Sequence, residues 1–305
     1  MPVRREVKRL AEHALAWSGV PWLSARARRH ATLILAYHDI VPHGAVRGGD
    51  ASLHLPQAQF ADQLDALART HDVVPLDVAL GGGAPARSRP RAAITFDDAY
   101  YGAVTAGVEE LARRALPATI FVPPGLLGGQ PFWWDVLAPA GDAGLDAGVR
   151  ARALATLTGT PRTHHANARR TPATRPPLPS HVRSATEEEL SRAAATPGIA
   201  LGSHTWSHPN LAALDEPELG DELARPLAWL RERYDGVVPV LTYPYGLFSP
   251  RVQHAARAAG YEAALRIDGG WLVRGRHDAF DLPRLDVSSG VSAAEGRLRV
   301  AGVLS

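Results

Sequence analysis

The sequence of 305 residues contains no cysteine. Disulfide bonds and thiolate ligands are therefore excluded, and any bound metal must be held by histidine or carboxylate side chains. Lysine is nearly absent as well: Lys8 is the single lysine, and the basic balance comes from arginine. The formal net charge is only +2, and no basic stripe with interleaved aromatic residues occurs, so we expect no nucleic-acid partner.

Long hydrophobic runs are also missing, and no stretch of 18 apolar residues could form a transmembrane helix. The stretch from Met1 to Leu23 has neither an uninterrupted apolar segment nor a small-residue cleavage site, so no secretory signal is indicated. We therefore expect a cytoplasmic protein.

The N-terminal segment is basic and amphipathic. Residues 1–30 contain seven lysine and arginine residues and two glutamates, with leucine and tryptophan side chains between them. This pattern predicts a basic amphipathic helix over residues 1–31, ahead of the main domain. Either the helix packs on the outside of the domain with its charges solvated, which we favour, or it makes peripheral contact with the inner face of a membrane. Periodicity alone does not separate the two.

Residues 32–305 alternate between apolar, β-prone runs and helical patterns. Strands are predicted at 32–36, 72–76, 92–96, 118–122, 237–242, 263–267 and 282–287, and helices at 60–68, 103–114, 216–234 and 250–259. Such alternation is typical of a parallel sheet, open or closed into a barrel. One α/β barrel domain accommodates a chain of this length.

Residues of about 140–185 interrupt this alternation. Between Ala147 and Thr186 there are seven arginines and five prolines but no acid. We interpret this stretch as an inserted helical or irregular lobe and expect its histidines to be solvated; these are His164, His165 and His181. Order resumes at Thr186, which forms a capping-box sequence with the glutamate three residues later.

Two adjacent carboxylates, Asp97 and Asp98, stand where the apolar run at 92–96 ends. Neighbouring residues on a strand point to opposite sides, so one acid can bind a metal while the other handles a proton. Taken alone, the pair could instead be a helix N-cap.

A second apolar run ends at His204, and His208 follows four residues later. On one helical turn this spacing places both imidazoles on the same face. Two histidines and one carboxylate leave coordination positions open for water and substrate on a divalent metal, as in a hydrolytic site.

Three motifs, in this order and spacing, resemble those of the NodB-type polysaccharide deacetylases, carbohydrate esterase family 4. They are Thr-Phe-Asp-Asp at 95–98, the His-x3-His pair at 204–208 and Tyr-Pro-Tyr-Gly at 243–246, with further support at 35–38, 117–122, 132–135 and 282–285. The resemblance covers about residues 32 to 288. It implies a distorted (β/α) barrel of seven or eight strands, similar to a TIM barrel, with the inserted lobe added to it. The active site is expected at the C-terminal ends of the strands.

The resemblance also implies roles for particular residues. Asp98, His204 and His208 would bind a divalent metal, usually zinc. Asp97 would be the general base that takes a proton from the attacking water. Tyr245 would supply a backbone N–H to the oxyanion and line the acyl pocket.

The aromatic pair at 133–134 belongs to one of the supporting segments. Trp134 either packs in the core or stacks on the face of a bound sugar ring. We include Trp134, with Tyr245, among the candidate substrate-binding residues.

The sequence departs from the family pattern in two places. An arginine that orients the catalytic aspartate usually stands two residues before the proline of the third motif, where this chain has Thr242. We hypothesise that Arg284 supplies the guanidinium from a neighbouring strand end.

The family's last motif, Leu-x-His, carries the general acid and has no counterpart near residue 285. His38, at the end of the first strand, is our substitute, with a hydrogen-bonded core histidine as the alternative.

These residues predict a metal-dependent hydrolase that removes an N-acyl group from an amino sugar, in a glycan, a lipid-linked sugar or a related biosynthetic intermediate. Two alternatives remain. One is another C–N hydrolase of the same superfamily, such as a deformylase or a cyclic-amide hydrolase. The other is a catalytically silent sugar-binding module, which the two departures from the family pattern make conceivable.

Overall fold

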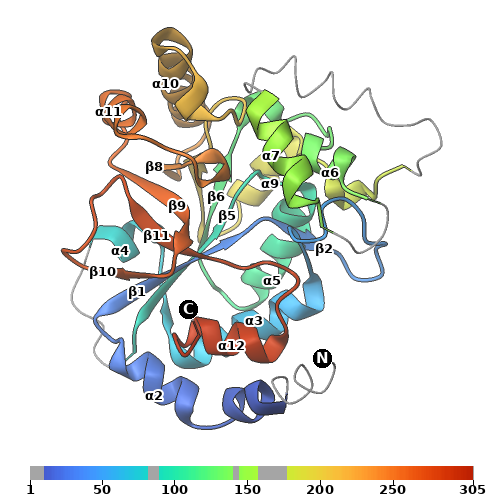
Figure 1. Ribbon diagram of the computed structural model, residues 1–305, viewed down its shortest axis with the longest axis vertical. Helices are drawn as coiled ribbons and strands as arrows, with labels where there is room; N and C mark the ends of the chain where they lie inside the picture. Colours follow the sequence, from blue (N-terminus) through green and yellow to red (C-terminus); the bar gives the residue numbers. More distant parts are fainter. Residues whose placement is uncertain (1–9, 82–88, 140–143, 157–176, 305) are drawn as a thin grey trace.

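The computed structural model describes residues 10–81, 89–139, 144–156 and 177–304. Within these residues, seven parallel strands pair in a closed ring, so the predicted α/β barrel is confirmed (Figure 1). In ring order the strands are β1 (Ala31–Tyr37), β11 (Leu282–Asp286), β9 (Ala263–Gly269), β8 (Val237–Thr242), β7 (Ile199–Ser203), β6 (Ala118–Val122) and β5 (Arg91–Phe96). The ring closes because β1 pairs with β11 on one side and with β5 on the other.

In the described part of the chain, four short strands lie outside the ring. β10 (Trp271–Val273) pairs antiparallel with β1, and β4 (Asp72–Val73) pairs with the start of β5. β2 (Asp39–Val41) and β3 (His54–Pro56) form a separate parallel pair beyond the end of β1. β4 is shorter than the predicted strand at 72–76 because the chain enters a helix at Leu76.

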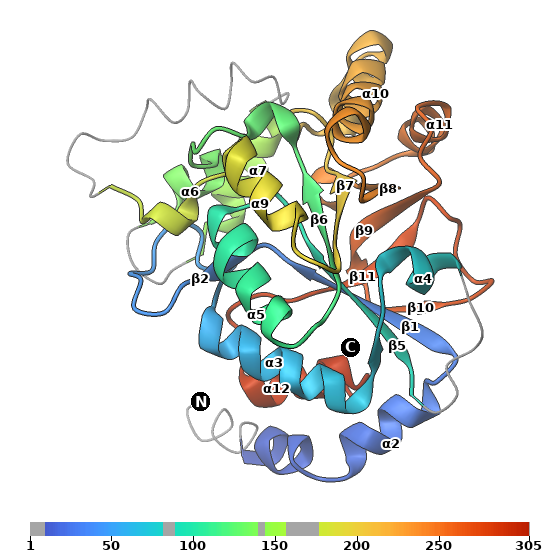
Figure 2. The ribbon, with the colours of Figure 1, turned by 180° about the vertical axis from the view of Figure 1, so that it is seen from behind.

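Helices surround the barrel, as the front and back views show (Figures 1 and 2). In the described residues they are α2 (Val20–Ala27), α3 (Gln57–Thr70), α4 (Leu76–Gly81), α5 (Val108–Arg113), α6 (Trp133–Leu137), α7 (Ala147–Thr156), α9 (Glu187–Ala194), α10 (Glu216–Arg233), α11 (Pro250–Ala258) and α12 (Ala293–Val300). Short helical turns lie at η1 (Ala103–Gly107), η2 (Pro124–Leu126), η3 (Ser180–Val182), η4 (Leu211–Ala213) and η5 (Pro244–Gly246).

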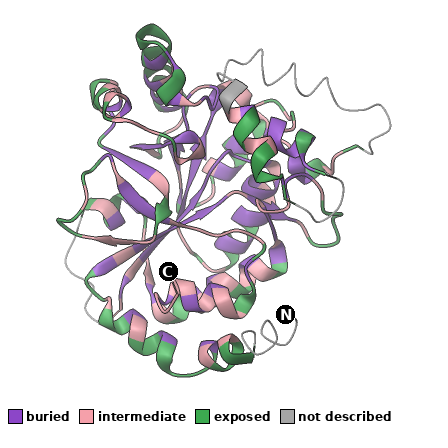
Figure 3. Ribbon diagram, in the orientation of Figure 1, coloured by how far each residue is buried: buried purple, intermediate pink, exposed green. Residues whose placement is uncertain are grey.

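The core sits inside the barrel and between the strands and the helices, where burial is concentrated (Figure 3). The predicted helical spacing is visible in α3, whose Phe60, Leu64 and Leu67 are buried together. The predicted capping box is present: the Thr186 hydroxyl accepts from the N–H of Glu189, and the Glu189 carboxylate accepts from the N–H of Thr186.

One predicted helix differs in its first turns. The segment from 103 to 107 is a π-helix that continues into α5. It begins beside Gly102, where a Cβ would lie 2.1 Å from the carbonyl oxygen of Ile40, so only glycine fits this close approach to β2.

The N-terminal segment is helical over residues 10–16 and again in α2. α2 packs against α3 and α12 on the outside of the barrel (Figure 1). Several apolar side chains of the segment point outward; they are Leu10, Trp17, Trp22 and Leu23. No helix in the described residues is long and apolar enough to cross a membrane.

Only part of the predicted insert lies in the described residues. This part comprises residues 144–156, which include α7, and residues 177–185. His164 and His165 lie outside the described residues. His181 lies within them, and its predicted solvation is wrong: the side chain is buried, with about 1% of its surface exposed.

Candidate active site

The chain turns sharply after β5 to direct two neighbouring acids to different partners. The strand ends at Phe96, and the backbone N–H of Asp97 donates to the carbonyl of Tyr37 at the end of β1. Asp98 and the next residue then adopt the left-handed conformation, with φ of 69° and 51°. Asp97 therefore faces Arg284 of β11, and Asp98 faces the histidines of the segment after β7.

Asp98, His204 and His208 meet at one point. The Nε2 atoms of His204 and His208 lie 3.4 Å and 3.2 Å from the Oδ1 atom of Asp98. All three side chains are buried, and their candidate ligand atoms lie within 4.8 Å of one another. Residues far apart in the sequence thus converge at the C-terminal ends of β5 and β7.

The predicted helical turn between the two histidines is wrong, because the chain from 204 to 208 is a loop. Thr205 and His208 have positive φ values of 64° and 58°, which a helix excludes. Glu222 on α10 holds this loop by accepting hydrogen bonds from the N–H groups of Trp206 and Ser207 and from the Ser207 hydroxyl. The conformation of this loop, and not a helical four-residue spacing, brings the two imidazoles together.

Thr242 stands where the family usually has arginine. In this protein it contacts the imidazole of His204. The Nδ1 of His204 lies 3.0 Å from the carbonyl oxygen of Thr242 and 2.6 Å from its hydroxyl. A proton on Nδ1 satisfies the carbonyl and leaves the lone pair of Nε2 directed toward Asp98.

These donors fit a divalent metal ion. The Oδ1 atom of Asp98 is buried and has no hydrogen-bond partner among the described residues, although two imidazole nitrogens face it. A cation between the three side chains would satisfy this oxygen, and two imidazoles with one carboxylate form a known ligand set for zinc and other first-row metals.

Arg284 lies against Asp97 inside the barrel. Its two terminal nitrogens donate to the two carboxylate oxygens at 2.8 Å and 2.6 Å, and its Nε donates to the carbonyl of Arg266. Burial alone would raise the pKa of Asp97, but the Arg284 guanidinium, with help from His204, outweighs it and lowers that pKa. Asp97 is thus held ionised in a fixed orientation.

His38 follows β1 at the same end of the barrel. It lies close enough to Asp97 and Asp286 to act on the pKa of both in the downward direction. Burial dominates at Asp286 and raises its pKa overall. Sequence reasoning missed Asp286 as a site residue; the available signal was its place at the end of β11, paired with Ala36 of β1.

Aromatic side chains form one wall of the site. The Tyr245 ring lies 4.6 Å from the His208 ring, and its hydroxyl accepts from the Nε1–H of Trp133. Trp134 packs 5.0 Å from His208, but only about 2% of its surface is exposed. Of the two interpretations of Trp134, packing behind His208 agrees with this burial, whereas stacking on a sugar needs an exposed ring face.

A buried hydrogen-bond chain behind this wall was also missed. The Nε1–H of Trp134 donates to the hydroxyl of Tyr100, which donates to Oδ2 of Asp135; the Oδ1 atom of Asp135 contacts Nε2 of His54. Asp135 therefore fixes the base of the aromatic wall.

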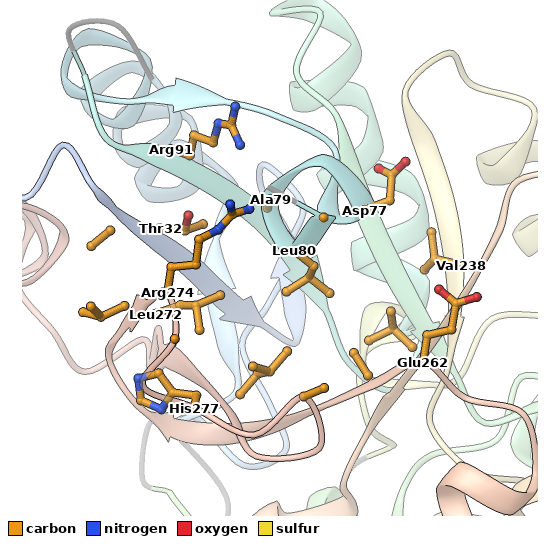
Figure 4. A pocket seen from close by; sticks show the side chains of 18 of the residues that line it. Thr32, Asp77, Ala79, Leu80, Arg91, Val238, Glu262, Leu272, Arg274 and His277 are labelled. Carbon is orange, nitrogen blue, oxygen red and sulfur yellow. The ribbon is translucent and has the colours of Figure 1, made fainter. Parts of the chain in front are cut away.

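A cavity of about 750 Å³ opens at the other end of the barrel (Figure 4). Its lining includes Thr32 at the start of β1, Val238 at the start of β8 and Leu80 on α4. It contains none of the predicted site residues, and residues 82–88, which follow the lining residue Gly81, lie outside the described part of the chain. We assign the chemistry to the C-terminal end, where the titratable groups converge.

Comparisons with known proteins agree with this geometry. Residues 84–264 match the family model "Polysaccharide deacetylase". No curated protein matches the chain by sequence. Three solved structures, each under 25% identical, share the fold.

The first is BC0361, a polysaccharide deacetylase from Bacillus cereus, with 13% identity and a TM-score of 0.61 over 88% of this chain and 69% of the other. The second is the Streptococcus pyogenes deacetylase PplD in complex with acetate, with 16% identity and a TM-score of 0.59 over 87% and 96%. The third is IcaB from Ammonifex degensii, with 18% identity and a TM-score of 0.60 over 90% and 96%.

The matched segment spans more than half of the chain and contains Asp97, Asp98, His204 and His208. The three motifs at 95–98, 204–208 and 243–246 thus lie within the matched region, whereas the supporting segments at 35–38 and 282–285 lie outside it. The chain belongs to the polysaccharide deacetylase family.

Proposed function

We propose that the protein is a metal-dependent hydrolase that removes the N-acetyl, or another N-acyl, group from an amino sugar in a glycan or lipid-linked intermediate. The observation that carries the proposal is the pairing of Asp97 with Arg284 directly beside the cluster of Asp98, His204 and His208. An ionised base next to a candidate metal centre is the arrangement that amide hydrolysis by activated water requires.

Asp98, His204 and His208 would hold the ion, and we propose Zn²⁺ because the chain offers imidazole and carboxylate ligands at this point. A bound Zn²⁺ supplies Lewis-acid chemistry, which polarises a carbonyl group and makes water more acidic. Thr242 fixes His204 so that its Nε2 lone pair faces the centre.

The remaining steps belong to side chains of this protein. Asp97 accepts the proton of the attacking water, and Arg284 keeps the Asp97 carboxylate ionised and oriented until it does so. His38 donates a proton to the departing amine, which otherwise leaves as a poor, strongly basic leaving group. Tyr245 limits the space beside His208 and so lines the pocket for a small acyl group.

The alternatives differ in what they need from this site. A silent sugar-binding module was conceivable because the usual arginine is missing, but Arg284 supplies a guanidinium to Asp97 from another strand. A deformylase or cyclic-amide hydrolase would use the same centre on a different substrate. Substrate trials, and not the geometry of the centre, separate these enzymes.

The test is acetate release from N-acetylglucosamine oligomers and from a lipid-linked N-acetylated sugar, with metal content measured on the same samples. We expect wild type to release acetate, a chelator to stop release, and added Zn²⁺ to restore it. Asp97→Asn should keep the metal and lose at least about 10³-fold in rate. Metal-loaded wild type that releases no acetate from either substrate would contradict the proposal.

α2 packs on the barrel against α3 and α12, as we favoured. We propose in addition that the outward face of the N-terminal segment makes peripheral contact with an anionic membrane surface. Leu10, Trp17, Trp22 and Leu23 expose between 52% and 71% of their surfaces. Arg26 of the same segment lies over the Trp22 ring, and Arg297 of α12 lies over the Trp17 ring. Exposed tryptophan and leucine with neighbouring arginine suit the boundary between lipid headgroups and acyl chains. Such contact would bring the barrel close to a lipid-linked substrate.

A further inference from the structure

A second cluster of titratable side chains lies outside the proposed catalytic centre. Asp39 at the start of β2, His54 at the start of β3 and His181 in η3 each expose at most 3% of their surface. Their candidate ligand atoms lie within 4.8 Å of one another, the same limit that the first cluster meets. The catalytic proposal uses none of these three residues.

Every ring nitrogen of the two histidines faces an acceptor. The Nδ1 atoms of His54 and His181 both approach Oδ2 of Asp39, at 2.8 Å and 2.7 Å. The Nε2 of His54 faces a carboxylate oxygen of Asp135 at 2.8 Å, and the Nε2 of His181 faces the carbonyl of Val46 at 3.0 Å. A neutral imidazole carries only one N–H, so two neutral rings cannot donate at all four contacts.

Two additional positive charges solve this problem, either as two protons or as one divalent cation. The cluster therefore needs additional positive charge to pair all four ring nitrogens with their acceptors. With Asp39 and Asp135 ionised, either solution leaves the cluster neutral, which a buried site requires.

The outer contacts of the two histidines fit a bound cation. With an ion near Oδ2 of Asp39, both histidines bind through Nδ1 and keep their protons on Nε2, where Asp135 and the Val46 carbonyl accept them. Metal-ligating histidines usually donate their other N–H to a carboxylate or a backbone carbonyl in this manner. The other oxygen of Asp39, Oδ1, is buried and has no hydrogen-bond partner among the described residues, so the carboxylate has a lone pair left to offer an ion.

We propose that Asp39, His54 and His181 bind a second divalent metal ion, of the class that takes imidazole and carboxylate ligands, such as Zn²⁺. The site is structural. It joins two short strands beyond the end of β1 to η3, near the end of the insert, and these elements are separated by up to 142 residues in the chain. Through His54 and Asp135 it also supports the Tyr100–Trp134 pair behind His208.

The decisive variant removes the first site and leaves the second unaltered. We expect the full-length double variant His204→Gln/His208→Gln, loaded with Zn²⁺ and desalted, to retain one ion per chain, against two for wild type. Adding His181→Gln should remove the remaining ion. His254→Gln, at an exposed histidine, is the matched control and should not change the count.

A second measurement uses wild type alone, so that the test does not depend on how the variants fold. Titration with Co²⁺, followed by its visible absorption, should saturate at two equivalents. Saturation at one equivalent, or a folded double variant that retains no Zn²⁺, overturns the second site and leaves the two-proton arrangement. Neither readout measures deacetylation, so failure here is distinct from failure of the proposed function.

Discussion

Arg284 donates a hydrogen bond to each carboxylate oxygen of Asp97, at 2.8 Å and 2.6 Å, although the two residues are 187 positions apart in the chain. Both side chains are almost completely buried at the C-terminal end of the barrel. The ring of strands makes the pairing possible, because β1 lies between β11 and β5 and places the ends of these two strands close together. The arginine missing from the third motif is therefore replaced from a different strand.

Replacing Arg284 by Gln should lower kcat by about 10²-fold, without abolishing activity, while leaving the metal bound. The same change leaves Asp97 as a buried, unpaired carboxylate, which costs about 3–5 kcal/mol of stability. Arg192→Gln is the control, because Arg192 forms an exposed ion pair on α9 that contributes at most about 1 kcal/mol. Retention of full activity in Arg284→Gln would refute its positioning role.

The same variant predicts a change in pH dependence. The guanidinium lowers the pKa of Asp97 in the folded protein, so its stabilisation is present above the unfolded pKa of about 3.9 and is lost as pH falls through the folded pKa. Without Arg284, burial raises the pKa of Asp97, and less of it is ionised in mildly acidic solution. The acid limb of kcat/KM should therefore move to higher pH in Arg284→Gln. An unmoved limb would mean that another group limits the rate.

His38→Gln should slow turnover far more than it weakens metal binding. Glutamine keeps the approximate size and polarity of the side chain but cannot deliver a proton near neutral pH, so a loss of about 10²–10⁴ in kcat is expected. The measurement pairs kcat with a zinc dissociation constant. If the two constants change by the same factor, His38 has a structural role.

Thr242→Val should weaken metal binding moderately. The variant keeps the carbonyl partner of His204 and removes the hydroxyl that lies 2.6 Å from Nδ1. Loss of such a supporting contact commonly reduces metal affinity by about 10–100-fold, and we expect the lower end because the carbonyl remains. Competition with a chromogenic chelator measures the change, and unaltered affinity would show that the hydroxyl does not position the ring.

If the N-terminal segment contacts membranes, the protein should cosediment with vesicles that contain anionic lipid and should bind neutral vesicles only weakly. Trp17→Ser/Trp22→Ser should reduce binding by removing the apolar anchors. Activity on a soluble oligomer should not change, since both residues are exposed on the outside of the barrel and contact none of the site residues. Equal binding of the variant and wild type would reject this contact.

Much of the fold was predictable because it depends on local patterns. The strands at 118–122 and 237–242 have the predicted bounds, since each is an apolar run ended by a proline-containing or polar turn. The helix predicted at 216–234 ends one residue earlier, at Arg233. Strands of two or three residues, such as β2 and β4, were missed or overextended because so few residues give no clear period.

The candidate ligands were predictable for a different reason. Asp98, His204 and His208 follow apolar runs, and polar residues at the C-terminal ends of barrel strands share one face of the fold. The local geometry was not predictable: the two histidines meet through a loop with positive φ values and not through a helical turn. Glu222, which holds that loop, comes from a helix that begins later in the chain.

The amino-acid sequence by itself determined the alternating fold, the family motifs and the chemical types of the candidate metal ligands, because strand period, turn residues and motif order are local properties. Tertiary structure alone decided which distant groups are partners. It placed Arg284 on Asp97, put Thr242 behind His204, and buried His181 with Asp39 where composition suggested a solvated lobe. The reason is physical: a buried charge must find its counter-charge or donor wherever the closed ring of strands brings one within reach, whatever their separation in the sequence.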